Sequence, residues 1–150
     1  MSREPHKLDI GQFDSGLRYQ PPAIFPTVLP SPTPTLVEAA TARVSAQGGS
    51  LTEDEVVAVL RAAGAPEAWI PDMVDIAWCE SRYSPYAVGD GGNSLGMFQL
   101  WTGWAQPMGF TRDDLFDPLK AAKTAVYVRE VRGRFGGAGG WSCADNLGIP

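Results

Sequence analysis

Long apolar runs and clusters of basic residues are both missing from this 150-residue sequence. No stretch of about 20 apolar residues occurs, so we predict no membrane-spanning helix. Lysine and arginine together number 12 against 17 aspartates and glutamates, which gives a net charge of −5. A nucleic-acid-binding protein normally carries a basic stripe that neutralises phosphates, and none is visible here. The composition therefore argues against a nucleic-acid partner.

Histidine and cysteine are also scarce, with one histidine and two cysteines, Cys79 and Cys143. Without a cluster of such residues we predict no zinc site, and we expect neither another metal nor a cofactor. The two cysteines are either free thiols or one disulfide. A disulfide between them would close a long loop, which stabilises a fold by about 4 kcal/mol in the chain-entropy treatment.

An apolar run of the kind found in secretory signals is absent from the N-terminus, MSREPHKLDIGQFDSG. Prolines instead crowd the first 35 residues, where they fix the backbone and remove hydrogen-bond donors. We therefore predict an extended, Pro-rich arm or linker over residues 1–49, in which residues 36–46 can form a short helix before Gly48 and Gly49. The globular domain is predicted to cover residues 50–150.

Helical signals dominate the second part of the chain. Residues 52–55, TEDE, match a capping box at the start of one helix. A second helix is predicted over residues 72–83, and a last long helix begins with Asp117 as N-cap and Pro118 at its first position. Residues 86–100, YAVGDGGNSLGMFQL, are glycine-rich and then apolar, which predicts a loop or small hairpin. The expected fold class is therefore mainly α.

Glu80 is the unusual residue of the second helix. It falls on the apolar face with Met73, Ile76 and Ala77, and no Lys or Arg stands three or four positions away to pair with it. A carboxyl group that is buried without a cation has a raised pKa, which suits a general acid near neutral pH. The spacing alone is equally compatible with a glutamate that points to water at the end of a helix.

The segment around Glu80, IAWCESRYSPYAVGDGGNSLGMFQLWTGW, carries several separated motifs in a fixed order. They are Glu-Ser at a helix end, Pro-x-Ala in a turn, and Ser-x-Gly-x-x-Gln from Ser94 to Gln99. This segment resembles the catalytic core of the lytic transglycosylases and related lysozyme-like enzymes, and FDPLKAAKTAVYVREVRGRFGG resembles their later helix. The resemblance extends over about residues 70–145. It implies a lysozyme-like α(+β) fold with Glu80 as catalytic acid and base.

The two cysteines add a second resemblance. The string CES at residues 79–81 and the string WSC at residues 141–143 are similar to an arrangement in the resuscitation-promoting factors, a related group of wall-cleaving proteins in which two such cysteines are bridged. This likeness implies a disulfide between Cys79 and Cys143. One transglycosylase segment, Ala-Tyr-Asn-Ala-Gly, is missing, and Tyr127 is the residue that can partly replace it.

The resemblance implies cleavage of the bond between N-acetylmuramic acid and N-acetylglucosamine in peptidoglycan. In the transglycosylase route one carboxyl suffices: Glu80 protonates the bond and then takes a proton from the sugar's C6 hydroxyl, which closes a 1,6-anhydro ring. Ser94 stands where some lysozymes have an aspartate, so a covalent mechanism is disfavoured. Asp90 either forms a turn or positions a water, and the second role would make the chain a hydrolytic muramidase.

Side chains near these motifs that offer hydrogen bonds or aromatic faces are predicted to contact the substrate. They are Ser81, Tyr83, Ser94, Gly96, Gln99, Trp101 and Tyr127, with Trp104 as a further stacking candidate. The implied partner is the peptidoglycan glycan strand, reached outside the cytoplasm. Since no signal is visible, we favour association with a virion, whose tail proteins the arm would contact. The alternative from another class is an inactive structural virion component that keeps the fold.

Overall fold

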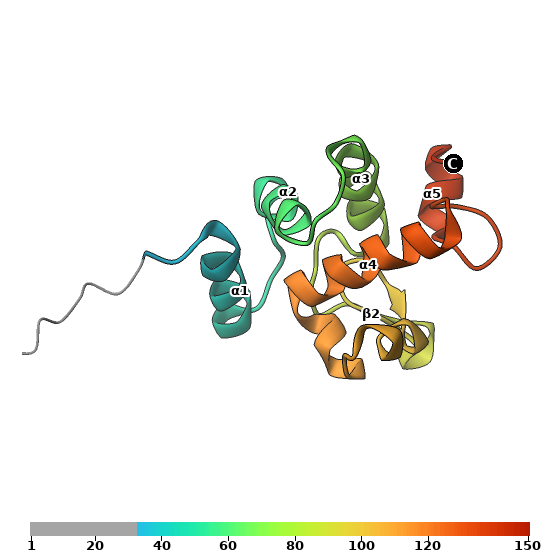
Figure 1. The fold of residues 1–150 in the computed structure, drawn as a ribbon. Helices are drawn as coiled ribbons and strands as arrows, with labels where there is room; N and C mark the ends of the chain where they lie inside the picture. The colour runs from blue at the N-terminus through green and yellow to red at the C-terminus, as the bar shows by residue number, and fades with distance from the viewer. Residues whose placement is uncertain (1–32) are drawn as a thin grey trace, which may run out of the picture. The chain divides into compact units, whose positions relative to one another are not determined.

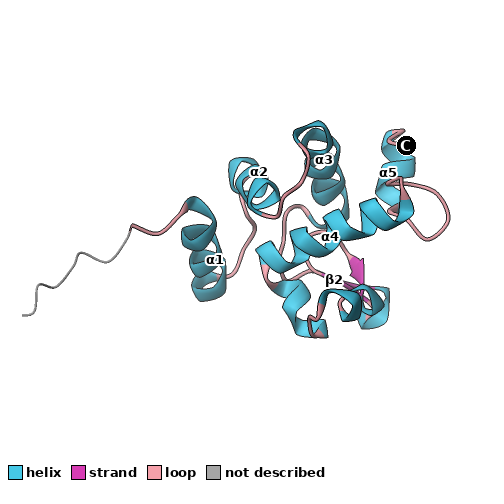
Figure 2. Cartoon of the chain, in the orientation of Figure 1, coloured by secondary structure: helices cyan, strands magenta, loops and turns pink. Residues whose placement is uncertain are grey.

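The computed structural model describes residues 33–150, which form one compact unit (Figure 1). Residues 1–32 of the predicted arm lie outside the described residues. Helices make up most of the described fold, and a small sheet supplies the rest of its regular structure (Figure 2). The predicted fold class, mainly α with a small hairpin, is confirmed.

Short 3₁₀ helices and three short strands connect the α-helices. The α-helices are α1 Leu36–Gln47, α2 Glu53–Ala62, α3 Ile70–Ser81, α4 Pro118–Arg132 and α5 Ser142–Leu147. The strands are β1 Val88–Gly89, β2 Ser94–Leu95 and β3 Leu100–Trp101. The 3₁₀ helices are η1 Glu67–Trp69, η2 Asp90–Gly92, η3 Thr102–Trp104, η4 Gln106–Met108 and η5 Arg112–Phe116. Among residues 33–150, none of the helices combines the length and apolar content that crossing a bilayer requires.

Local capping fixes where two of the helices begin. The Thr52 side chain accepts a hydrogen bond from the backbone of Glu55, whose carboxylate accepts one from the Thr52 backbone in return. Asp117 accepts a hydrogen bond from the backbone of Lys120, and Pro118 occupies the first position of α4. Both predicted helix starts are therefore confirmed.

The short helix predicted at residues 36–46 of the arm is present as α1, and this helix packs against α2. Ala40 and Val44, one helical turn apart, are each only 1% exposed and belong to the core. Arg43 on the same helix forms an ion pair with Glu55 of α2 at 2.6 Å. Apolar burial and this ion pair therefore join α1 to the domain that was predicted to start at residue 50.

Helix α4 crosses the described unit in Figure 1 and contacts α2, η5 and β3. Its buried face includes the small residues Ala121, Ala122 and Ala125, which allow neighbouring elements to approach closely. Phe98 and Leu60 are fully buried in the same core. Helix α3 packs against both α2 and α5. This packing fixes the end of α3 relative to the sheet and the C-terminal segment.

The sheet is antiparallel with the strand order β1-β2-β3, and it pairs Val88 with Leu95 and Leu95 with Leu100. Between β2 and β3 the chain turns through Gly96, whose φ is 77°. A Cβ atom at this position would lie 2.1 Å from the carbonyl oxygen of Leu115. Glycine is therefore required here both by the left-handed backbone and by the close approach of η5.

Gly96→Ala is expected to lower the free energy of unfolding by at least about 2 kcal/mol, because the added carbon must displace the Leu115 carbonyl in a strained backbone conformation. Urea unfolding followed by circular dichroism measures the loss. Gly109→Ala is the matched control, since Gly109 has a similar φ of 70° and nothing within 4 Å of an added Cβ. Equal losses in the two variants would contradict the role of the close contact.

Candidate active site

Glu80 is the penultimate residue of α3, and the chain leaves this helix through Arg82 and Tyr83 in left-handed conformations. The Glu80 side chain is partly buried. Its Oε1 accepts a hydrogen bond from the backbone N–H of Cys143 at 3.3 Å. None of the ion pairs formed within residues 33–150 involves Glu80. The carboxyl group is thus desolvated in part and is held by a backbone donor instead of a cation.

Burial raises the pKa of Glu80 above the ordinary value of a glutamate. The Cys143 N–H acts in the opposite direction, because it stabilises the ionised carboxylate, and the negative charge of Asp90 raises the pKa further. Of the two alternatives that the spacing left open, the structure thus favours the partly buried carboxyl over a glutamate that points to water. A carboxyl in this environment keeps its proton closer to neutral pH than a solvated glutamate does, as a general acid requires.

A cleft of about 390 Å³ opens beside Glu80. One part of its lining comes from the sheet region and the other from the segment that leads into α5. The lining residues are Glu80, Asp90, Ser94, Gln99, Trp101, Gly139, Gly140, Trp141 and Ser142. The first five of these were singled out from the sequence, and the fold brings them to one place. Glu80 therefore faces a cleft and does not point away from the sheet as a solvated helix end would.

Asp90 and Ser94 form a hydrogen-bonded pair within the cleft. The Ser94 hydroxyl, which is buried, donates to the Asp90 carboxylate and not to Glu80. Asp90 itself is exposed and has a φ of 49°, as a turn residue does. It therefore combines a turn conformation with a carboxylate that reaches the cleft. Within residues 33–150, no group of three or more His, Cys, Asp or Glu side chains is placed to hold a metal ion.

Gln99 reaches the cleft from the turn between β2 and β3. Its backbone has a φ of 46°, and its side-chain Nε2 donates to the Gly96 carbonyl at 3.0 Å. The amide oxygen of Gln99 occupies the space beside Gly89, where an ideal Cβ would lie only 2.3 Å from it. The hydrogen bond to Gly96 orients the carboxamide, and the absence of a side chain at Gly89 leaves room for its oxygen.

Trp141 supplies part of the opposite wall, which the sequence reasoning did not assign to the site. Its indole N–H donates to the Phe98 carbonyl at 2.7 Å, and its backbone N–H donates to the Phe135 carbonyl at 3.1 Å. The first bond ties this wall to the residue before Gln99. The neighbouring lining residues Gly139, Gly140 and Ser142 were missed as well. The WSC string at residues 141–143 is the sequence signal that points to this wall.

Two predicted substrate-binding residues support the backbone of the site and do not line the cleft. The Ser81 hydroxyl donates to the carbonyl of Met97 at 2.7 Å and to that of Ala77 at 3.2 Å. Ser81 thus connects the end of α3 to the turn between β2 and β3. Gly96 allows that turn to approach the Leu115 carbonyl of η5 closely.

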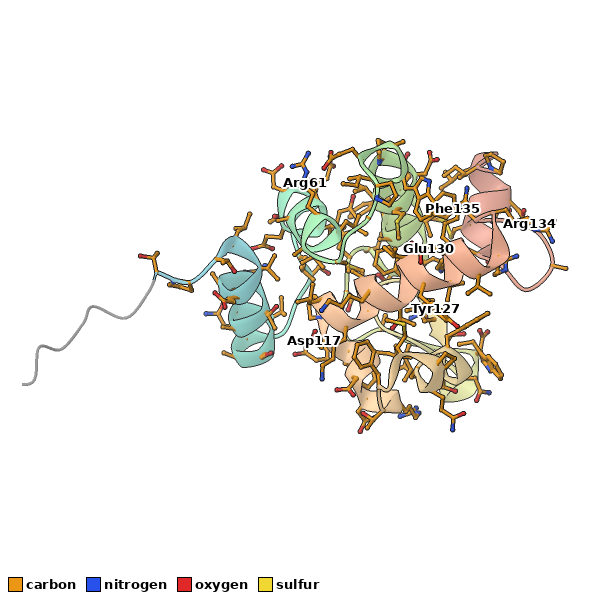
Figure 3. The ribbon with its side chains drawn as sticks, viewed as in Figure 1. Arg61, Asp117, Tyr127, Glu130, Arg134 and Phe135 are labelled. Atoms are coloured by element: carbon orange, nitrogen blue, oxygen red, sulfur yellow. A yellow bond between two sulfur atoms is a disulfide. The ribbon has the colours of Figure 1, made fainter. Side chains whose placement is uncertain are left out.

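The aromatic residues Tyr83 and Tyr127, which were predicted to contact sugar, also lie outside the cleft lining. Tyr83 is buried and packs against Trp78 with ring centroids 5.0 Å apart. Tyr127, on α4 (Figure 3), packs edge-on against Trp104 at 6.2 Å. The left-handed turn after α3 and the packing around α4 direct these rings toward neighbouring aromatics.

A disulfide joins Cys79 of α3 to Cys143 of α5, as the second resemblance implied. The two cysteines flank the site from different elements, since Cys79 precedes Glu80 in the chain and the Cys143 N–H donates to the Glu80 carboxyl. The bond therefore fixes the hydrogen-bond donor of Glu80 and anchors the wall that contains Trp141.

Comparison with known families bears directly on this site. A family model for the transglycosylase SLT domain matches residues 58–144. The chain belongs to this family. The matched region of the SLT domain contains every residue that lines the Glu80 cleft. Members of the family are lytic transglycosylases that act on the glycan strands of peptidoglycan, which lie outside the cytoplasm. No curated protein sequence and no solved structure was found to match the chain.

Proposed function

We propose that this SLT domain cleaves the β-1,4 bond between N-acetylmuramic acid and N-acetylglucosamine and leaves a 1,6-anhydro-N-acetylmuramic acid end, with Glu80 as both acid and base. The observation that carries this proposal is the state of Glu80. It is a partly buried carboxyl with a raised pKa, it forms no ion pair with a cation of residues 33–150, and it lines a polar cleft. Such a group keeps its proton to higher pH than a solvated glutamate does and can release it to a bound glycosidic oxygen.

The reaction needs one carboxyl group that changes its protonation state twice. Protonated Glu80 donates its proton to the glycosidic oxygen, the bond from that oxygen to C1 of the muramic acid breaks, and the N-acetylglucosamine leaves as an alcohol. The acetamido group of the muramic acid stabilises the cation that forms at C1. Ionised Glu80 then removes the proton from the C6 hydroxyl, and O6 bonds to C1. The enzyme returns to its starting protonation state without water as nucleophile.

The composition of the cleft supports a mechanism with one carboxyl. A retaining glycosidase needs a second carboxylate as nucleophile close to the acid. Asp90 is the other carboxylate in the lining, and it is exposed and accepts a hydrogen bond from Ser94. Gln99, Ser142 and the backbone of Gly139 and Gly140 supply polar groups for the sugar substituents.

A hydrolytic muramidase is the second candidate, because Asp90 lines the same cleft and its charge raises the pKa of Glu80. In that reaction Asp90 would hold a water molecule that attacks C1. Mass spectrometry of digested peptidoglycan separates the two functions. We expect anhydro-muropeptides as the main products. Reducing ends with only hydrated muramic acid would assign the chain to the muramidases.

An inactive structural component of a virion is the candidate from another class. Gel zymography with peptidoglycan is expected to show clearing by the wild type, and clearing by neither the wild type nor Glu80→Gln would favour the structural role.

We further propose that the protein acts at the cell wall after delivery by a virion and that residues 1–49 contact tail proteins. Detection of the chain in purified particles tests this delivery. The pair Cys79 and Cys143 is the feature that motivates the likeness to the resuscitation-promoting factors.

Trp101→Ala is expected to raise KM for glycan strands by about threefold to tenfold, because the indole offers a stacking surface for a sugar ring. The side chain is 60% exposed at the edge of the cleft, so its removal leaves the core intact. Steady-state kinetics on soluble glycan strands measure the change. Trp78→Ala is the control, since Trp78 is also an exposed tryptophan but does not line the cleft. An unchanged KM in Trp101→Ala would remove the indole from substrate binding.

A further inference from the structure

A second cleft of about 460 Å³ adjoins the first, because the Trp101 side chain lines both. It is formed by η3, η4 and the start of η5, with Phe110 and Ala105 among its apolar lining residues. The Trp101 ring packs over Gly103, where an ideal Cβ would lie 2.2 Å from a ring carbon. The indole is thus held as a wall between the two clefts. A ligand that extends past Trp101 from Glu80 enters the second cleft.

The two clefts carry opposite charges. Among residues 33–150, the charged side chains that line the first cleft are the carboxylates of Glu80 and Asp90, whereas the charged side chain that lines the second is Arg112. The first arrangement suits an uncharged sugar bond, since an anion near the bond would be repelled. A cation beside an apolar surface suits a ligand part that combines carboxylate and aliphatic groups. The clefts together therefore fit a ligand that is neutral at one end and acidic at the other.

Arg112 is positioned so that it can accept such a partner. Its Nη2 donates to the Gly92 carbonyl at 3.0 Å, which holds the guanidinium beside the loop that carries Asp90. Its Nη1 lies 3.3 Å from the Asp113 carboxylate, but both side chains are largely exposed, at 52% and 79%. An exposed pair of this kind contributes little to stability. Because a guanidinium has five N–H donors, Arg112 retains donors for a ligand carboxylate.

We propose that the second cleft binds the peptide stem of peptidoglycan, with Arg112 paired to a stem carboxylate while the sugar bond lies beside Glu80. This inference rests on the proposed function for its substrate. Peptidoglycan combines both required features, because its sugar backbone is largely neutral and its stem peptides carry the carboxylates and aliphatic side chains. The second cleft would therefore make cleavage sensitive to whether a muramic acid still bears its stem.

The test compares peptidoglycan with the same glycan strands after an amidase has removed their stems, which removes the stem carboxylates and leaves only the short lactyl carboxylate on each muramic acid. Arg112→Gln is expected to lower kcat/KM on stem-bearing strands by about fivefold and to leave kcat/KM on stem-free strands unchanged. Arg61→Gln is the matched control, since it removes the same charge from α2 (Figure 3) and Arg61 lines neither cleft. An equal loss on both substrates would overturn the proposal, because Arg112 would then act only through the Gly92 loop. An unchanged rate on both would overturn it too.

Binding measurements keep this inference distinct from the proposed function. Calorimetric titration with a soluble disaccharide-peptide and with the same disaccharide without peptide needs no turnover. We expect the wild type to bind the peptide-bearing ligand more tightly than the peptide-free one. In Arg112→Gln the ratio of the two Kd values should fall by about fivefold. Absence of cleavage by the wild type would contradict the proposed function alone. Equal affinity of the wild type for the two ligands would contradict the stem site.

Discussion

Replacing Glu80 by glutamine is expected to lower kcat for peptidoglycan cleavage by a factor of about 10²–10⁴, the usual contribution of a general acid–base group. Glutamine keeps the shape of the side chain and its oxygen can still accept the Cys143 hydrogen bond, but it neither gives nor takes a proton. Release of soluble muropeptides from purified sacculi measures the rate. Undiminished release by Glu80→Gln would remove Glu80 from the mechanism.

The stability of Glu80→Gln separates a loss of chemistry from a loss of fold. Because burial raises the pKa of Glu80 in the folded state, the native protein binds this proton more tightly than the unfolded chain does. The contribution of Glu80 to stability is therefore fully present below its unfolded pKa and is lost as pH rises through its folded pKa. At pH values above the folded pKa, the wild type must keep an ionised, partly desolvated carboxylate at position 80. Glutamine at this position stays neutral and avoids that cost. Calorimetry at neutral pH should find a Tm at or above that of the wild type, and a lower Tm would make the activity result uninformative about proton transfer.

The pH dependence of the rate tests the same group through its neighbour. Activity should fall as pH rises through the pKa of Glu80, because the acid must be protonated to begin the reaction. Asp90→Asn removes a negative charge that raises this pKa, so the falling limb should move to lower pH while the maximal rate is kept. If Asp90 instead holds an attacking water, the maximal rate should drop by about 10²-fold or more.

Helix starts are predictable because their causes are local. The capping pairs Thr52–Glu55 and Asp117–Lys120 depend on residues three positions apart. The capping box that starts α1 is equally local, since Thr35 and Glu38 form it, but the packing of this helix on α2 depends on tertiary contacts. The sequence leaves the orientation of Glu80 open, because its raised pKa depends on burial and on Cys143 and Asp90, which the fold brings close.

The residues around Glu80 were predicted less well, because their roles depend on contacts distant in the sequence. Tyr83 is close to Glu80 along the chain, but the left-handed turn after α3 directs its ring to Trp78. Trp141 is far from Glu80 in the sequence, and a hydrogen bond to Phe98 brings it to the cleft. An aromatic residue near a catalytic motif therefore says little about the wall of a site until the path of the chain is known.

Removal of the Cys79–Cys143 bond by the double substitution Cys79→Ser and Cys143→Ser is expected to destabilise the domain by about 4 kcal/mol. The bond spans 64 residues, so its loss restores much conformational entropy to the unfolded chain. Trp141 still holds the C-terminal segment through the Phe98 carbonyl, which favours a folded but weakened variant at low temperature. Urea unfolding compares the variant with the wild type, and a loss below about 1 kcal/mol would contradict the entropic role.

The same double variant has a consequence for catalysis that general weakening would not produce. The Cys143 N–H lowers the pKa of Glu80, and the disulfide holds this donor in place. When the bond is absent, Glu80 should keep its proton to higher pH, so the falling limb of the pH–rate profile should move upward while kcat decreases. The shift has the opposite direction to that expected for Asp90→Asn. Wild-type protein is the control. Its falling limb should move upward after reduction with a thiol and return to its first position after reoxidation. If the falling limb of the pH–rate profile does not move in the folded double variant, the Cys143 N–H stays bonded to Glu80 without the disulfide.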